Sequence, residues 1–242
     1  MSLHPIFDDA PKKFADDHTF RIRLGSQVNG QPKAHKTLRI TTGDPTLADD
    51  IAELLGGTPA SWDTSTEEDI EVLTETALVE VIFENIRHEF LQWGKSKQPI
   101  RACDGYTQQD DLATTCYCRD AFPELRLWKA GAKRGTACQP TTKASVRLAA
   151  KPDLGMGRFQ STAWSLLKGD PIWLKDKMPD GEVWQPPITE LEAALAAYDG
   201  RALGTLELKQ VQFENAAKEI VKFSKPVFTI IGPVPVDALV AG

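Results

Sequence analysis

Alternating hydrophobic and polar residues predict short β-strands along most of the chain. Thr19–Leu24 alternates with a period of two, and Asn29-Gly30, shortly after it, favours the tight turn of a β-hairpin. We expect the return strand at Lys36–Thr41. Other strand-like runs, bounded by turn residues, follow at residues 71–74, 77–83, 89–93, 100–103, 144–149 and 157–164.

Apolar residues spaced by three and four positions predict a helix after residue 44. Asp44 is a good N-cap, and Pro45 suits the first helical turn. Gly56-Gly57 is expected to end the helix. The residues on its apolar face are Leu47, Ile51, Leu54 and Leu55.

A second helix is predicted in the last third of the chain, over the string ITELEAALAAYDG. Thr189 and Glu192 form a capping-box pattern at its start. Gly200 stands where a helix would end, because glycine readily adopts the left-handed conformation of a C-terminal stop.

Two longer strands are predicted after this helix, at Thr205–Phe213 and Ile220–Ile231, as an antiparallel pair. The hydrophobic alternation of the first strand shifts phase at Gln210, which predicts a β-bulge there. Together, the many strands, the hairpin signals and the two or three helices predict an α+β fold with a mainly antiparallel β-sheet.

All four cysteines lie in one segment of the chain. Four thiolates around one Zn²⁺ would form a closed tetrahedral structural site, and the metal would stabilise a segment with few large apolar residues. We therefore predict a zinc-pinned subdomain with the ligands Cys103, Cys116, Cys118 and Cys138. Two other interpretations stay open, namely two disulfides or small buried hydrophobic side chains.

These features divide the chain into predicted parts. The cysteine/zinc subdomain covers residues 103–140, between an N-terminal α+β region at 18–102 and a C-terminal α+β region at 141–235. We expect the two α+β regions to pack together as one globular unit. An N-terminal arm at 1–17 and a tail at 236–242 complete the chain.

The net charge of −6 disfavours a large phosphate-binding surface, which normally makes a domain basic. An acidic chain is better matched to a basic protein partner. The sequence is expected to contain no signal peptide and no apolar run long enough to span a membrane. We therefore expect a protein of the reducing cytoplasm.

Few residue patterns favour catalysis. The four histidines do not form an HExxH metal motif, and no GxSxG nucleophile elbow is present. His35 lies beside the predicted hairpin and His88 beside charged residues, so we expect both at the surface. Glu67 and Glu68 are expected to be solvated loop carboxylates. The chain is therefore predicted not to be an enzyme.

Exposed aromatic residues are candidate partner contacts, because tryptophan and arginine are common anchors of interfaces. The candidates are Trp128 in the cysteine segment and Trp173 and Trp184 in a proline-rich connection, although these tryptophans could instead belong to the core. The basic residues close to Trp128 are Lys129, Lys133 and Arg134. If this cluster contacted phosphates, the chain would be a zinc-dependent nucleic-acid-binding protein, which is the main alternative.

Several strings resemble one protein family. RIRLGSQVNGQPK and LRITTGDPTLADDIAELLGG resemble the opening of the recombination directionality factors of actinophages that use large serine integrases. The CDG, CYC and CQPTT motifs resemble the middle section of that family, and PDLGMGRFQSTAWSL resembles the strand-turn-strand that follows it. The resemblance extends from about Phe7 to Pro235.

The resemblance implies a regulator rather than an enzyme. Factors of this family bind the integrase, activate excisive attL × attR recombination and inhibit integrative attP × attB recombination. They are thought to act near the zinc domain and coiled-coil arm of the integrase, and to affect DNA only through it. The expected setting is therefore the cytoplasm of a bacterial host, with a phage-encoded serine integrase as partner. A structural phage protein of unknown role is a further alternative.

Overall fold

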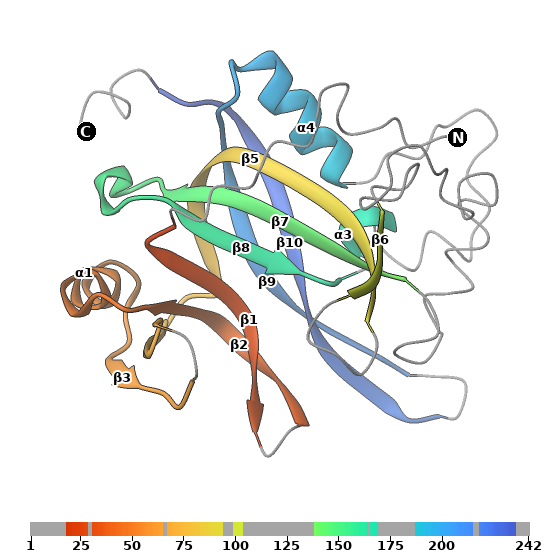
Figure 1. Cartoon of the computed structure of the whole chain (residues 1–242), viewed down its shortest axis with the longest axis horizontal. Coiled ribbons are helices and arrows are strands. Elements are labelled where there is room, and N and C mark those ends of the chain that lie inside the picture. Colours follow the sequence, from red (N-terminus) through yellow and green to blue (C-terminus); the bar gives the residue numbers. More distant parts are fainter. Residues whose placement is uncertain are drawn as a thin grey trace. The chain divides into compact units, whose positions relative to one another are not determined.

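The computed structural model of the 242-residue chain describes residues 18–28, 31–64, 67–93, 99–103, 138–163, 165–168, 187–214 and 218–235 (Figure 1). The predicted arm at 1–17, the tail at 236–242 and most of the predicted cysteine subdomain lie outside the described residues. The chain divides into two compact units. Unit 1 comprises Met1–Ala15, Arg87–Lys143 and Ser161–Trp164, and unit 2 comprises Asp16–Ile86, Ala144–Gln160 and Ser165–Gly242.

The described strands form a ten-stranded hydrogen-bonded sheet. They are β1 Phe20–Val28, β2 Gln31–Thr42, β3 Pro59–Ser61, β4 Ile70–Leu73, β5 Leu78–Trp93, β6 Pro99–Cys103, β7 Gln139–Leu148, β8 Gly157–Ser161, β9 Ala202–Glu214 and β10 Ile220–Pro233. Their order is β10-β9-β5-β7-β8-β1-β2-β4-β3, with β6 paired to β5. The pairs β1–β2, β2–β4, β3–β4, β5–β6, β5–β9 and β9–β10 are antiparallel, and β1–β8 is parallel.

Helices occupy a small part of the described chain. They are α1 Pro45–Leu55, α4 Pro187–Ala197, the short α3 Ser165–Lys168 and the 3₁₀ turn η1 Pro152–Leu154. Helix α1 begins as predicted, because the Asp44 carboxylate accepts hydrogen bonds from the backbone N–H groups of Thr46 and Leu47 at 2.9 and 3.3 Å. The predicted α+β architecture with a mainly antiparallel sheet is confirmed.

Helix α4 departs from the prediction at its start. It begins at Pro187, a residue suited to the first helical turn, so Thr189 lies inside the helix rather than at its N-cap. Glu192 Oε1 has no hydrogen-bond partner among the described residues, and burial raises the pKa of this carboxyl to about 7. The predicted capping box is therefore wrong. The predicted end is confirmed, since Gly200, at φ +80°, donates its N–H to the Leu195 carbonyl at 2.7 Å.

The core of unit 2 forms where its sheet coils back on itself. Phe228 of β10 meets Phe83 of β5 and Phe159 of β8 edge to face, with ring centroids 5.2 and 5.3 Å apart. Three strands separate β10 from β8 in the sheet order, so the second contact requires a strongly coiled sheet. Coiling also brings β10 to β2, where the Ser224 hydroxyl donates to the His35 carbonyl at 2.8 Å.

Two strand predictions are corrected. Strand β5 runs without a break from Leu78 to Trp93, because both of its faces carry buried residues and its alternation is lost in the middle. The β9–β10 register is continuous through Gln210, which pairs with Ser224, and its irregularity lies between Ile230 and Gly232. The predicted bulge at Gln210 is therefore wrong, and the phase shift in the sequence has another cause.

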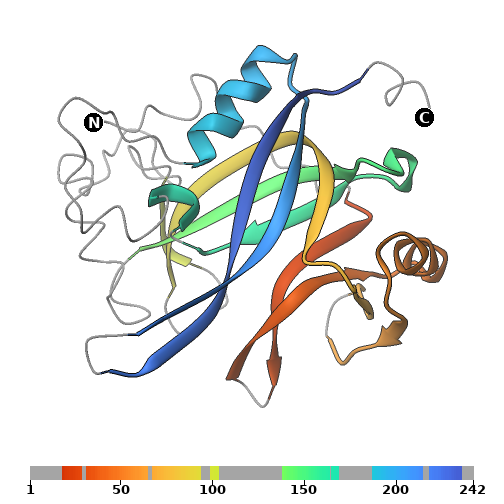
Figure 2. The same cartoon turned by 180° about the vertical axis from the view of Figure 1, so that it is seen from behind.

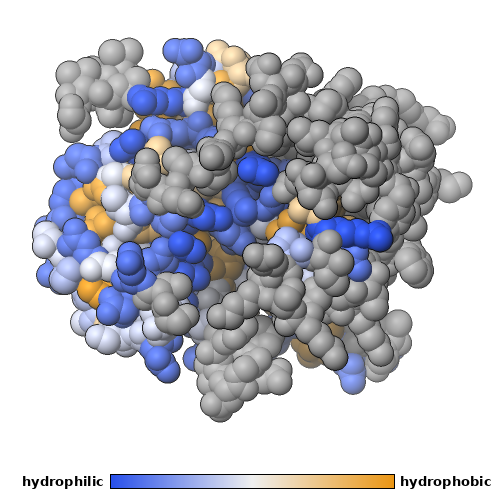
Figure 3. Space-filling view, in the orientation of Figure 1, coloured by the Kyte–Doolittle hydropathy of each residue, from blue (hydrophilic) through white to orange (hydrophobic). Residues whose placement is uncertain are grey.

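The face of the molecule in Figure 3 is mostly hydrophilic where it is described, with small groups of hydrophobic residues between the hydrophilic ones. The large hydrophobic side chains that remain exposed among the described residues are Leu73, Leu78, Tyr198, Phe213, Ile220 and Ile231. Three of these belong to β9 and β10. No helix in the described ranges is long and apolar enough to cross a membrane.

Candidate functional site

Strands β1 and β2 present a polar face opposite the core of unit 2. Ile22 of β1 is buried, and Arg21 and Arg23 flank it in the sequence. Because successive side chains point to opposite faces of a strand, the two arginines share the other face. In register, Arg21 pairs with Thr41 of β2, and Arg23 pairs with Arg39. Three guanidinium groups are thus concentrated on one small part of the sheet.

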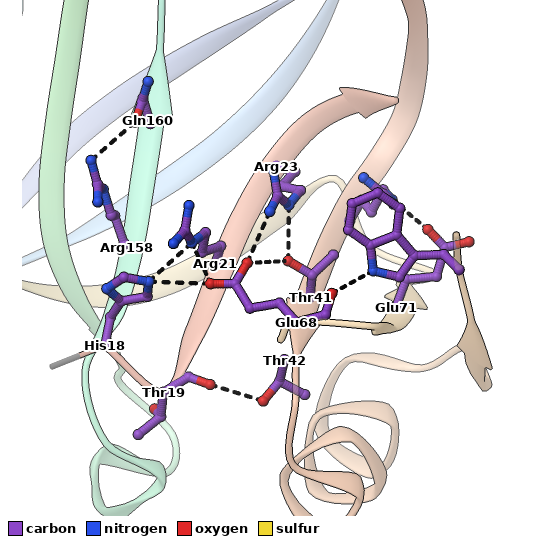
Figure 4. A network of polar contacts seen from close by, with 12 residues as sticks. His18, Thr19, Arg21, Arg23, Thr41, Thr42, Glu68, Glu71, Arg158 and Gln160 are labelled. Carbon is purple, nitrogen blue, oxygen red and sulfur yellow. Dashed lines mark hydrogen bonds and ion pairs between the residues drawn. The ribbon is translucent and has the colours of Figure 1, made fainter. Parts of the chain in front are cut away.

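Glu68 lies at the centre of this polar face, although it comes from the segment before β4 (Figure 4). Its Oε1 forms an ion pair with Arg21 Nε and lies 3.2 Å from His18 Nε2. Its Oε2 accepts hydrogen bonds from Arg23 Nη2 at 2.9 Å and from Thr41 Oγ1 at 3.4 Å. The side chain of Glu68 is only 14% exposed, so these partners replace the hydrogen bonds that water would make.

Trp62 closes the cluster from the side of the segment before β4. Its Nε1 donates a hydrogen bond to the Glu68 backbone carbonyl at 2.6 Å. The guanidinium carbons of Arg39 and Arg23 lie 4.4 and 5.4 Å from the centroid of its ring, within the range of cation–π attraction. Arg39 also pairs with Glu71 of β4 at 2.5 Å. The indole therefore covers the arginines and fixes the backbone that carries Glu68.

His18 completes the cluster as a largely buried imidazole, with 8% of its side chain exposed. Its Nε2 lies 3.0 Å from Arg21 Nε, which is a donor, and 3.2 Å from Glu68 Oε1, which is an acceptor. Burial first, and then the charge of Arg21, lowers the pKa of His18 below its ordinary value of 6.5, and Glu68 opposes this shift. The surroundings of His18 therefore favour its neutral form.

The cluster is suited to holding charge rather than to transferring protons. Arginine stays protonated in proteins, and its planar fork matches a carboxylate. Of the side chains above, three arginines face Glu68 and Glu71, which leaves an excess of one positive charge. Through Glu68 the polar cluster connects the chain just before β4 to β1 and β2, and Trp62 is bonded to the same residue. The cluster leaves the side chains of Arg21 and Arg23 33% and 28% exposed, so both can still meet an acidic group from outside.

Two sequence predictions about polar residues are corrected here. Glu67 is exposed as predicted, but Glu68 is not a solvated carboxylate, because three cationic or neutral donors of β1 and β2 surround it. His88 is 1% exposed rather than at the surface. Its Nδ1 lies 3.2 Å from Thr142 Oγ1, and its ring meets Phe90 edge to face, so a hydrogen bond and an aromatic contact accompany its burial.

One signal in the sequence could have revealed the cluster. Arg21 and Arg23 alternate with apolar residues in a strand whose other face is buried, and arginines beside a core are expected to pair with carboxylates. The identity of the carboxylate could not be read in this way. Glu68 is separated from Arg23 by 45 positions, and the fold alone brings them together.

The predicted zinc ligands are only partly within the described residues. Cys103 ends β6, opposite Phe90 of β5, and Cys138 immediately precedes β7, which neighbours β5. Both cysteines are buried, at 4% and 8% exposure, and both belong to unit 1. Cys116 and Cys118 lie outside the described residues.

The predicted tryptophan contacts are not placed by the structure. Trp128, Trp173 and Trp184 all lie outside the described residues. Within the described ranges, no group of three or more His, Cys, Asp or Glu side chains has the arrangement of a metal site. Both the zinc site and the tryptophan contacts therefore stay predictions.

Apart from His18, the polar cluster falls within one family match, as do all four cysteine positions. A family model described as Gp3-like, recombination directionality factor-like, matches residues 21–169, which is more than half of the chain. The chain belongs to this family. The resemblance seen in the sequence is thereby confirmed. No solved structure matches the chain.

Membership in the recombination directionality factor-like family indicates the kind of protein to which the polar cluster belongs. The description is that of a regulatory factor in DNA recombination, which points to a recombinase as the partner. The matched residues include Arg21, Arg23, Arg39 and Glu68, whereas β9 and β10 lie beyond them. The family match therefore covers these residues of the polar cluster and does not cover the β9–β10 hairpin.

The polar cluster predicts a large loss of stability when Glu68 is neutralised. Glu68→Gln keeps the shape of the side chain but leaves Arg21 and Arg23 without a counter-charge in a partly buried site. We expect the free energy of unfolding to fall by about 2 to 3 kcal/mol, which urea denaturation followed by circular dichroism would measure.

Glu67→Gln is the matched control, because Glu67 is the exposed neighbour in the same segment. This substitution should change the free energy of unfolding by less than about 0.5 kcal/mol. Equal stabilities for the two variants would contradict the role assigned to Glu68.

Proposed function

We propose that the chain is a recombination directionality factor of a phage large serine integrase. It binds the integrase, activates excisive attL × attR recombination and inhibits integrative attP × attB recombination. The observation that carries this proposal is the family match over residues 21–169. The factor is phage-encoded and works in the cytoplasm of the bacterial host.

The direction of recombination depends on the relative stability of the synaptic assemblies rather than on the chemistry of strand exchange. Strand exchange makes as many phosphodiester bonds as it breaks, so the stable synaptic assembly decides which products accumulate. A partner changes that outcome only by binding one assembly more tightly than the other. Moving a two-state preference from about 1:99 to 99:1 takes about 5.5 kcal/mol of differential binding, an amount that several protein contacts on an oligomeric integrase can share.

The charge of the factor supports action on protein rather than on DNA. A net charge of −6 makes a phosphate-tracking surface unfavourable, and it favours a basic protein partner. We propose that the contact lies near the zinc domain and coiled-coil arm of the integrase. In this proposal the factor affects DNA only through the integrase.

Zinc bound by Cys103, Cys116, Cys118 and Cys138 is part of the same proposal. Burial of Cys103 and Cys138 in one unit, close to the same strand, suits ligands of a closed structural site. Such a metal would supply folding free energy to the segment between them and would take no part in chemistry. The alternative is that the cysteines are small buried side chains of a core, and the metal content of the protein distinguishes this case from a zinc site.

Recombination in vitro tests the proposed function. With its cognate integrase, the purified factor should raise the yield of attL × attR recombination and lower the yield of attP × attB recombination, because it stabilises one synaptic assembly. Both yields would be read from the same gel, with and without the factor. A factor that leaves both yields unchanged would contradict the proposal.

Elemental analysis tests the zinc site. Purified protein should contain about one zinc ion per chain, and Cys116→Ser or Cys118→Ser should remove most of it, since a tetrahedral site that loses one thiolate binds metal far more weakly. A protein that folds fully and contains less than about a tenth of an equivalent would exclude the site.

A further inference from the structure

The β9–β10 hairpin has two unlike faces. Directly opposed residues of an antiparallel pair lie on the same face, and Leu206 pairs with Phe228. Both side chains are buried, as is Leu208, so this face of the hairpin belongs to the core of unit 2. The far half of the hairpin comprises the end of β9 and the start of β10, residues 209–214 and 220–225. In Figures 1 and 2 this half runs away from α4.

The opposite face of that far half is hydrophobic. Val211 pairs in register with Phe223, and Phe213 pairs with Val221. Positions 211 and 213 lie an odd number of residues beyond Leu208, so these four side chains point away from the core side. Phe213 is 48% exposed, and its ring centroid lies 6.1 Å from that of Phe223. We call Val211, Phe213, Val221 and Phe223 the outer hairpin patch.

The inner side of the same half is polar and already bonded. Ser224 Oγ and Gln210 Nε2 donate hydrogen bonds to the His35 carbonyl of β2 at 2.8 and 3.3 Å, and Gln210 Nε2 lies 3.0 Å from Ser224 Oγ. These bonds fix which side of the hairpin faces β2. The outer hairpin patch is therefore held outward. The phase shift of the sequence at Gln210 marks this exchange of hydrophobic residues from the inner to the outer face.

Positive charge borders the patch on its own face. Lys209 and Lys225 pair in register two positions along from the pair of Val211 and Phe223, with the pair of Gln210 and Ser224 between them. The odd spacing of Lys209 from Leu208 places both lysines on the outer side of the sheet. Glu207 lies on the same face, so this border carries two lysines and one acid, a net charge of +1, beside the exposed Phe213 of a chain whose net charge is −6. Hydrophobic patches rimmed by polar residues commonly mark protein interaction sites.

The other charged candidate surface is less available. In the polar cluster, Arg21 and Arg23 already hold the carboxylate of Glu68, so an outside acid would have to displace it. The outer hairpin patch consists of apolar side chains, and Phe213 is the most exposed of them. It also lies beyond residues 21–169, so the family match assigns it no role.

We propose that the outer hairpin patch, with Lys209 and Lys225, is the surface through which the factor docks on the integrase. Its occupant is a segment of the integrase with adjacent apolar side chains and an acidic residue next to them, so that apolar groups cover Phe213 and the acid meets the lysines. This inference rests on the proposed function, because it assumes the integrase as partner.

Binding of matched variants tests the inference. The affinity of the full-length factor for its cognate integrase, without DNA, would be measured by biolayer interferometry. Phe213→Ser should weaken binding about 30-fold, as for the loss of a central aromatic anchor. Ile220→Ser is the matched control, because Ile220 is 63% exposed on the same hairpin but pairs with Glu214 on the other face. It should change the affinity less than about 2-fold.

A charge reversal provides an independent second variant. Lys209→Glu should weaken binding about 10-fold at low salt and less at high salt, since it opposes an acidic group across the interface. Lys222→Glu, on the opposite face through its pairing with Gln212, should have little effect. Circular dichroism would verify that all four variants stay folded.

The possible outcomes distinguish an error in the docking surface from an error in the proposed function. The inference is supported if Phe213→Ser and Lys209→Glu lose affinity for the integrase and the two control variants do not. If the wild-type factor alters recombination yields but both variants bind like wild type, the docking surface is wrong and the proposed function stands. If the wild-type factor alone forms a dimer that Phe213→Ser dissociates, the patch binds a second copy and the inference is overturned. If wild-type factor neither binds integrase nor changes its products, the proposed function itself fails.

Discussion

The contact of Phe228 with Phe83 and Phe159 is the interaction on which the arrangement of unit 2 depends. It joins strands at positions far apart in the sheet order, so the sheet must coil, and coiling creates an inside and an outside. The same coiling brings Ser224 to the His35 carbonyl, which orients the far half of the β9–β10 hairpin. Packing of three aromatic rings thereby determines which side of that hairpin meets solvent.

The polar cluster has a different role. It attaches to the sheet a segment that has no hydrophobic core of its own. The sequence at 62–69 is mostly polar, and Glu68 and the ring of Trp62 connect this part of the chain to the arginines of β1 and β2. Guanidinium–carboxylate pairs give direction as well as attraction, because a fork of donors fits only one carboxylate orientation. Arg21, Arg23, Arg39 and Glu68 of this cluster lie within the residues that the family model matches.

The sequence predicted what local chemistry controls. Asp44 followed by Pro45 predicted the start of α1, and Gly200 predicted the end of α4, because caps and stops depend on neighbouring residues. Contacts between distant residues were not predictable, which is why Glu68 was expected in water and His88 at the surface. The phase change at Gln210 was seen, but a bulge was inferred, since the pattern alone cannot show that the hairpin leaves the core.

The central claim is that this factor distinguishes two assemblies of one recombinase. Its affinity for integrase bound to attL and attR, compared with integrase bound to attP and attB in the same buffer, tests that claim most directly. Direction can change only through a difference between these two affinities. The account predicts clearly tighter binding to the attL and attR complexes, and equal affinity for both sets would contradict it.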